Sequence, residues 1–232
     1  MTDERRHRWT VCLLLACTFA TGVVDAVGYL GLDRVFVGNM TGNVAILGMA
    51  LAGGGELPVA GPAVALVSFL VGAAGAGRVL RHRRAGWSGR GGLLLLGSGA
   101  VFLGVTLVLA RQDVERVGPG TTATGPQWLV LVTGALAIAM GVQAATARRI
   151  AVPDLTTVVV TSTLTGLAAD SRLAGGSGPA WRSRAGAVLV LVAGAAAGAA
   201  LLRVHLAAGT GLAGLVLLGV AFAGRRAVRA AG

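Results

Sequence analysis

The sequence predicts an all-helical membrane protein built from two related halves. Three observations point to this fold class: a high apolar content, several apolar runs near the length of a membrane span, and an internal repeat. Of the 232 residues, 55% are hydrophobic, and the mean hydropathy is +0.78. A helix needs about 20 mostly apolar residues to cross a bilayer core. Soluble domains rarely contain so many runs of this kind.

The internal repeat is visible without gaps. Residues 9–26 align with residues 128–145, and seven of eighteen positions are identical, including a Trp at the start of each segment. Residues 72–81 align with residues 194–203, and both segments end in Arg. Apolar matches are common in such a composition, but paired Trp and Arg residues are not. Related halves in a membrane protein indicate a site where the halves meet.

Six apolar segments are long enough to be full spans. They are approximately residues 9–30, 59–79, 93–110, 128–147, 185–202 and 206–223. The basic N-terminus and first apolar run resemble a signal peptide, but further spans follow and the run is repeated internally, so we expect a retained first helix. Two other apolar pieces, residues 35–52 and 155–169, contain Gly, Asn, Ser and Thr.

The arginines decide how to interpret these two pieces. All twenty basic residues are Arg. If both pieces cross the membrane, giving eight spans, the cytoplasmic segments hold eleven Arg and the external ones nine. If both pieces instead enter and return on the same side, the counts become sixteen and four. The positive-inside rule favours the second arrangement, with both termini in the cytoplasm of a bacterial plasma (inner) membrane.

Each half then reads as span, re-entrant piece, span, span. With three spans per half, residues 1–119 and residues 120–232 enter the membrane from opposite sides and form inverted repeats, as in many transporters. A helix from Met40 to Leu51 would rise about 18 Å, and one from Val160 to Asp170 about 16 Å, so neither spans a full bilayer core. The eight-span arrangement stays open as the alternative.

Two polar clusters mark the starts of the predicted half-helices. Asn or Thr can cap a helix start, and Gly permits close backbone approach. The N–H groups and positive dipole ends of two half-helices would attract an anion or polar ligand oxygens. The same side chains could also only hold helices together. The candidate solute-binding residues are Asn39, Thr41, Gly42, Asn43, Thr161, Ser162 and Thr163.

Asp25 is the only acidic residue well inside a predicted span. An ionised carboxylate in hydrocarbon is expensive, so we consider Asp25 a candidate coupling or gating residue. Its alternative role is a salt bridge or hydrogen bond near the outer surface, with Arg34 as the nearest candidate partner. The repeat aligns Asp25 with Ala144, and the neighbouring Gln143 is the second candidate coupling or gating residue.

The sequence gives little support for an enzyme, a metal or cofactor site, or a nucleic-acid-binding protein. The three His and two Cys residues form no ligand cluster, and no nucleophile elbow, phosphate loop or dinucleotide motif occurs in a fitting context, so no catalytic residue, metal or cofactor is predicted. The net charge of +11 comes from arginines beside apolar segments, without a basic helix or aromatic platform, so we expect no nucleic-acid partner.

A family resemblance agrees with these expectations. The run GVVDAVGYLGLDRVFVGNMTGN, followed by VAILGMALA, resembles the opening of the YoaK family of bacterial membrane proteins of unknown function. GVQAATARR and TTVVVTSTLTGLA resemble its second-half element. Ala144 and Ser162 depart from that element, in which Asn and Gly are common at these positions. The resemblance implies an integral membrane protein with six helices and supplies no substrate.

The sequence thus favours a membrane permease or channel for a small polar or anionic solute. We expect the lipid bilayer and a small-molecule solute as partners, and the Gly-rich helix faces are compatible with a homo-oligomer. The alternative is an integral membrane binding or assembly protein whose polar clusters only join helices. An enzyme is not expected, because no nucleophile–base pair is present.

Overall fold

The computed structural model describes residues 3–82, 86–111, 127–150, 160–171, 174–176 and 181–229. Within these ranges the chain forms eight helices and no strand. The boundary predicted between the two halves, at residues 119 and 120, lies outside the described residues. The helices are α1 (Asp3–Gly31), α2 (Met40–Leu51), α3 (Ala60–Leu80), α4 (Gly89–Ala110), α5 (Gln127–Ile150), α6 (Val160–Ala169), α7 (Trp181–Leu202) and α8 (Leu206–Arg229).

Six of the described helices are long and apolar enough to cross a membrane: α1, α3, α4, α5, α7 and α8. This confirms the six long apolar helices that the sequence predicted as spans. The other two, α2 and α6, have 12 and 10 residues. At 1.5 Å per residue they extend about 18 and 15 Å, short of the roughly 30 Å hydrocarbon core. Both begin at the residue predicted from the sequence, although residues 155–159 of the second polar piece lie outside the described residues.

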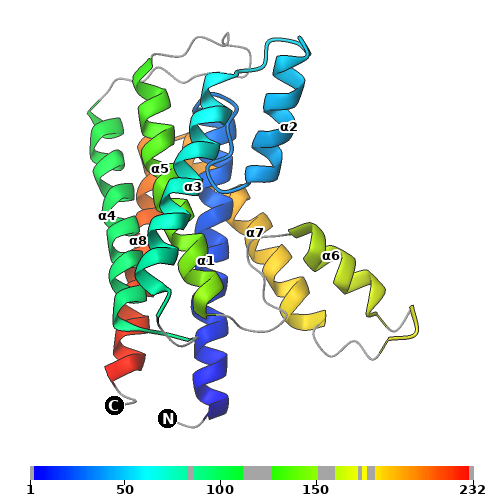
Figure 1. Ribbon diagram of the computed structural model, residues 1–232, viewed down its shortest axis with the longest axis vertical. Coiled ribbons are helices and arrows are strands. Elements are labelled where there is room, and N and C mark those ends of the chain that lie inside the picture. The colour runs from blue at the N-terminus through cyan, green and yellow to red at the C-terminus, as the bar shows by residue number, and fades with distance from the viewer. Residues whose placement is uncertain are drawn as a thin grey trace.

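The path of the chain places the start of α2 partway along the bundle. Figure 1 shows α1 running up from the N-terminus and the chain then turning back down before α2 begins partway along the bundle. Helix α2 rises to the same end at which α1 finishes, and α3 descends from there. In the second half, α5 descends, α6 descends from partway along the bundle, and α7 rises. Both termini lie at the same end of the bundle (Figure 1).

Helix packing pairs the two halves with each other. Helix α1 packs extensively on α7, and α5 packs extensively on α3, while α4 packs on α8. The share of the apolar window that is buried is 61% in both α1 and α5 but only 22% in α3 and 17% in α7. The first helix of each half is therefore central, and its main partner belongs to the other half.

Glycines allow the two long helix pairs to cross closely. A Cβ atom on Gly22 of α1 would overlap the carbonyl oxygen of Leu191 in α7. A Cβ atom on Gly141 of α5 would likewise overlap the carbonyl oxygen of Phe69 in α3. Gly141 is the position that the sequence repeat aligns with Gly22. Such small residues let helix backbones touch in a membrane, where no hydrophobic effect drives helices together.

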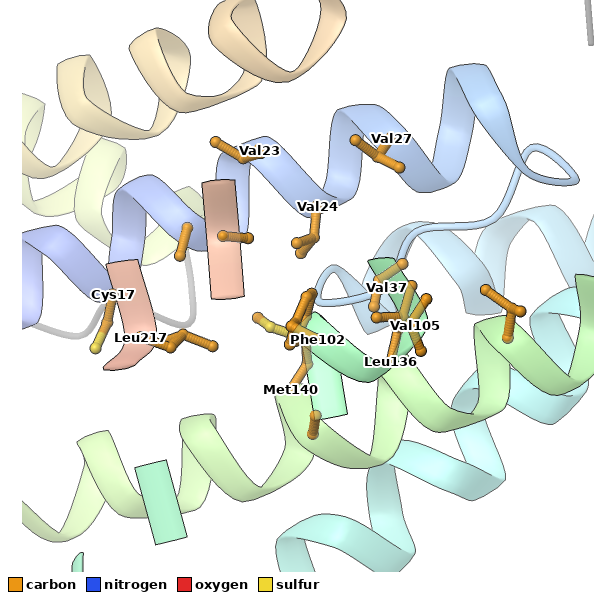
Figure 2. Packing of buried hydrophobic residues seen from close by; sticks show 14 of the residues in the cluster. Cys17, Val23, Val24, Val27, Val37, Phe102, Val105, Leu136, Met140 and Leu217 are labelled. Atoms are coloured by element: carbon orange, nitrogen blue, oxygen red, sulfur yellow. The ribbon is translucent and has the colours of Figure 1, made fainter. Parts of the chain in front are cut away.

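The apolar core lies between the central helices. Figure 2 shows Val24 of α1, Phe102 of α4 and Met140 of α5 close together, with Val37 beside Leu136. Val37 lies in the connection between α1 and α2 and is fully buried. Its burial brings the connection into the bundle, and the adjacent polar residues are brought in with it.

Many large apolar side chains on the outside of the bundle remain exposed. They include Leu70 on α3, Leu131 on α5, Leu189 on α7 and Leu215 on α8, each more than 60% exposed. In a soluble protein such a surface would promote aggregation, whereas in a bilayer it contacts lipid. The exposed apolar surface supports the assignment of these helices as membrane spans.

Candidate functional site

The connection between α1 and α2 folds back onto α1 and meets Asp25 there. The backbone N–H groups of Gly38 and Asn39 donate hydrogen bonds to Asp25 Oδ1, at 2.7 and 3.2 Å. Asp25 lies six residues before the end of α1, so the start of α2 sits about 9 Å below that end. A carboxylate is therefore held at the N-terminus of a short helix, where N–H groups and the helix dipole stabilise negative charge.

Gly38 is the point of closest approach between the connection and the bundle. A Cβ atom placed on Gly38 would lie 3.0 Å from Thr21 Cγ2, 3.1 Å from Met140 Cε and 3.5 Å from Asp25 Oδ1. The short distance from its N–H to Asp25 therefore depends on the absence of a side chain. Of the residues around this point, sequence reasoning singled out Asp25 and missed Thr21 and Met140.

Asn43 fixes the other side of the connection. It is fully buried, its Oδ1 accepts from the Phe36 N–H at 2.9 Å, and its Nδ2 donates to the Phe36 carbonyl at 2.6 Å. The Phe36 ring stacks on Tyr29 of α1 with centroids 4.9 Å apart. The Asn43 amide therefore satisfies the backbone of Phe36, and its contacts are those of a residue that shapes the site.

The remaining predicted residues of this cluster lie at the start of α2. Asn39 is the N-cap, and its Oδ1 accepts from the Gly42 N–H at 3.2 Å. This cap is the arrangement expected for Asn before a helix. Asn39 and Thr41 are exposed, and Gly42 is half-buried against the Phe36 ring. The side chains that a solute could reach directly are thus Asn39 and Thr41.

Asp25 does not pair with Arg34. Within the part of the chain that the structure describes, the ion pairs are Arg8 with Glu4 and Arg184 with Asp170, and neither involves Asp25. Arg34 lies in the connection with a positive φ of 49°. The backbone N–H groups of Gly38 and Asn39 replace the salt bridge considered from the sequence.

The second predicted cluster lies on α6. Thr161 and Ser162 are exposed, and Thr163 is buried. Arg184 of α7 holds α6 in place by donating to the Gly166 carbonyl at 2.8 Å and by pairing with Asp170. Among the described residues, α6 packs on α7 and does not pack on α2. Helices α2 and α6 both begin partway along the bundle (Figure 1), and no described residue of one packs on the other.

Gln143 occupies a buried position between α5 and α1. It is 3% exposed, and its Nε2 donates to the Cys17 carbonyl at 3.2 Å. Its Oε1 is buried and has no hydrogen-bond partner. Thr21 Oγ1 donates to the same Cys17 carbonyl at 3.0 Å. Cys17 is buried in the apolar core, and the spacing of Cys17, Thr21 and Asp25, four residues apart, puts all three on one face of α1.

The described residues contain no group of three or more His, Cys, Asp or Glu side chains that could hold a metal ion. The polar groups that come together are instead one carboxylate, amide and hydroxyl side chains, and the backbone of the α1–α2 connection. Such groups can interact with a polar molecule by hydrogen bonds and charge.

The comparisons with known proteins agree with this architecture. Residues 13–223 match the family described as "Protein of unknown function (DUF1275)". The chain belongs to this family. It is also 29% identical over 166 residues to the "UPF0700 transmembrane protein YoaK" of Bacillus subtilis (strain 168), covering 71% of this chain and 67% of the relative. This confirms the resemblance seen in the sequence. No solved structure matches the chain.

Proposed function

We propose that this multi-pass membrane protein is a permease or channel for a small polar solute. The observation that carries the proposal is the pairing of Asp25 with the N–H groups of Gly38 and Asn39 inside the length of a membrane-spanning helix. Charged and polar groups within membrane segments are costly and commonly belong to a solute path. The exposed Asn39 and Thr41 lie at the same place.

The proposal includes two inverted repeats, each with a re-entrant half-helix. The close crossings at Gly22 and Gly141 support it, because aligned positions of the two halves make equivalent contacts. Transporters with this design place their sites at the ends of broken helices near the repeat interface. The described part of α6 does not pack on α2, so we place the site at the α1–α2 connection and assign Thr161 to a separate part of the path.

The orientation forms part of the same proposal. Both termini lie at one end of the bundle (Figure 1), and we assign that end to the cytoplasm of a bacterial plasma membrane. The arginines support this side, because they concentrate in the segments at that end.

A membrane assembly or binding protein is the second candidate, and one observation favours it. Asn43 is fully buried and both ends of its amide are satisfied by Phe36. Thr18 and Thr146 likewise donate to carbonyls of their own helices. Polar groups with such partners hold the fold together without needing a solute.

Cysteine accessibility separates the two candidates. We would replace Cys12 and Cys17 by Ala and introduce a single Cys at Thr41 or at Thr161. A solute path predicts rapid reaction of both positions with a small water-soluble thiol reagent. The matched control is Leu70→Cys, because Leu70 is 64% exposed on the outer face of α3 and should contact lipid.

The two candidates predict opposite results. A permease gives a reaction rate at Thr41→Cys at least about tenfold above that of Leu70→Cys, since thiolate forms only where water reaches it. Equal, slow rates at all three positions would reject the solute path and favour the assembly protein.

A further inference from the structure

The face of α1 that carries Asp25 continues inward as a line of polar atoms. Cys17, Thr21 and Asp25 are spaced four residues apart on α1, and Gln143 of α5 meets this line at the Cys17 carbonyl. Gly38 links the line to the α1–α2 connection, because it lies against both Thr21 and Asp25. We call Cys17, Thr21, Asp25 and Gln143 the acceptor track.

The inner end of the track carries an unsatisfied acceptor. Gln143 is only 3% exposed, and its Oε1 has no hydrogen-bond partner. The orientation of its amide is determined, because the group facing the Cys17 carbonyl oxygen must be the donating NH₂. Buried side-chain oxygens without a partner are uncommon and call for a missing donor.

Most of the hydrogen-bonding capacity left over along the track belongs to acceptors. The N–H groups of Gly38 and Asn39 donate to Asp25 Oδ1, and the Val37 N–H also donates to this carboxylate, whose remaining lone pairs can still accept. Thr21 uses its hydroxyl proton on the Cys17 carbonyl and retains only lone pairs. Together with Gln143 Oε1, these atoms can accept hydrogen bonds but cannot donate them.

The negative charge of Asp25 also disfavours an anionic ligand. The described ion pairs do not include Asp25, so its carboxylate faces backbone N–H groups and no cationic side chain. The same carboxylate already occupies N–H groups at the start of α2 that an anion would need. An anion would meet repulsion from Asp25 and would find few donors along the track: the second N–H of Gln143 Nε2 and the Cys17 S–H.

We propose that the acceptor track binds a small cation that donates hydrogen bonds, of the primary ammonium type. The inference rests on the proposed solute path and names the class of its solute. An ammonium group offers three donors, Asp25 supplies the charged acceptor for it, and Thr21 and Gln143 supply neutral acceptors further along the track. The surrounding apolar residues, Met140 among them, would favour a small alkyl group on the same molecule.

The first experiment measures binding to the purified full chain. Methylammonium chloride is titrated while the thermal unfolding temperature is followed, with sodium chloride and sodium formate at the same ionic strength as comparisons. Binding to the native state raises the unfolding temperature with ligand concentration. We expect a saturable rise with methylammonium alone. Equal responses to all three salts, or a response to formate only, would overturn the proposal.

Two variants locate the site, and a third is the control. Gln143→Leu should raise the Kd for methylammonium about three- to tenfold, the effect of losing one neutral hydrogen bond, and Asp25→Asn should raise it more than about tenfold, the effect of losing a charged one. Thr146→Val is matched to Gln143→Leu, because Thr146 is buried on the same helix and donates only to its own helix. It should leave the Kd unchanged.

Gln143→Leu also separates binding from a purely structural role. Without ligand, the variant should unfold within a few degrees of the parent chain, because it loses the hydrogen bond to the Cys17 carbonyl but also removes an unsatisfied buried oxygen, and that carbonyl keeps Thr21 as a donor. A loss of stability together with an unchanged Kd would mean that Gln143 only supports the fold and would reject its place in the site.

A failure here can be told apart from a failure of the solute path. If Thr41→Cys reacts rapidly with water-soluble reagents but methylammonium does not bind, the permease proposal stands and the cation proposal is wrong. If Thr41→Cys is as unreactive as Leu70→Cys, both are wrong. The charge of the reagent adds a direct test: at Thr41→Cys the preference for an aminoethyl over a sulfonatoethyl thiosulfonate should exceed that of a free thiol in water, and Asp25→Asn should reduce it to that value.

Discussion

Individual hydrogen bonds decide how a polar connection is accommodated beside apolar helices. The α1–α2 connection and the start of α2 carry backbone groups that have no partner within a helix, and three polar side chains bond them. Asp25 accepts from Gly38 and Asn39, Asn43 pairs with both backbone groups of Phe36, and Asn39 caps α2. Each unsatisfied buried group would cost about 1–3 kcal/mol, so these residues matter for stability as well as for a solute.

Replacing Asn43 should show its structural role. Asn43→Leu has a similar volume but strands the N–H and C=O of Phe36, so we expect a loss of about 2–5 kcal/mol in stability. Thermal unfolding of the purified chain would show a clear drop in the midpoint. Val44→Leu is the control, because Val44 is the next residue of α2 and is 59% exposed. If the Asn43→Leu chain is as stable as the control, the hydrogen bonds between Asn43 and Phe36 do not stabilise the fold.

Asp25 should tolerate Asn better than Leu as far as folding is concerned. Asn keeps an oxygen that can accept from Gly38 and Asn39, whereas Leu leaves both N–H groups without a partner. We expect Asp25→Asn to unfold within a few degrees of the parent chain and Asp25→Leu to lose about 2 kcal/mol or more. Any transport that depends on the charge should be lost in both. Full transport by a stable Asp25→Asn chain would contradict a coupling role.

At the level of elements, the helix crossings at Gly22 and Gly141 hold the bundle together. At each crossing the glycine backbone faces a carbonyl oxygen of the partner helix, and a methyl group would force the helices apart. The partners are α7 for Gly22 and α3 for Gly141, so each crossing joins the two halves. Neither half buries its central helix by itself.

Alanine at either crossing should therefore destabilise the protein. We expect Gly22→Ala and Gly141→Ala each to lower stability by about 1–3 kcal/mol, the range for overpacking a well-packed contact. Gly97→Ala and Gly104→Ala are the controls on α4, because a Cβ at either position meets nothing within 4 Å. They should be neutral or slightly stabilising, since Ala favours helix more than Gly does. Unfolding midpoints in detergent provide the measurement, and equal midpoints for all four variants would reject the close crossings.

At the level of the whole molecule, the end of the bundle at which a helix begins or ends determines the side of the membrane on which that helix end lies. Arg81 follows α3 and its carbonyl accepts from Arg149 at the end of α5, so these two helix ends lie together. Figure 1 places both termini at this same end. Arg203 lies between α7 and α8, at the opposite end of α7 from Trp181.

Single cysteines at Arg81 and Arg203 should be labelled from opposite sides of the membrane. With re-entrant α2 and α6, Arg81→Cys reacts from the cytoplasmic side and Arg203→Cys from the outside. With eight spans, both positions would be external, so Arg203→Cys serves as the fixed reference. An impermeant thiol reagent applied to intact cells and to inverted vesicles gives the answer. Labelling of Arg81→Cys in intact cells would reject the re-entrant arrangement.

The sequence by itself determined that the protein is all-helical and membrane-bound, the six long helices, and the residues at which α2 and α6 begin. These features depend on local properties: the length of an apolar run, and the capping ability of residues such as Asn39. The family was recognisable for the same reason, since the MTGN element around Thr41 is contiguous in the chain.

Only the tertiary structure decided which polar atoms meet. Gly38 and Asn39 reach Asp25 across 13 and 14 residues, and Gln143 reaches Cys17 across 126. These pairings depend on how each helix is rotated about its axis and where helices cross, and the long-range glycine contacts set both. Apolar periodicity carries little of that information in a membrane, because lipid-facing and core-facing residues are alike in polarity.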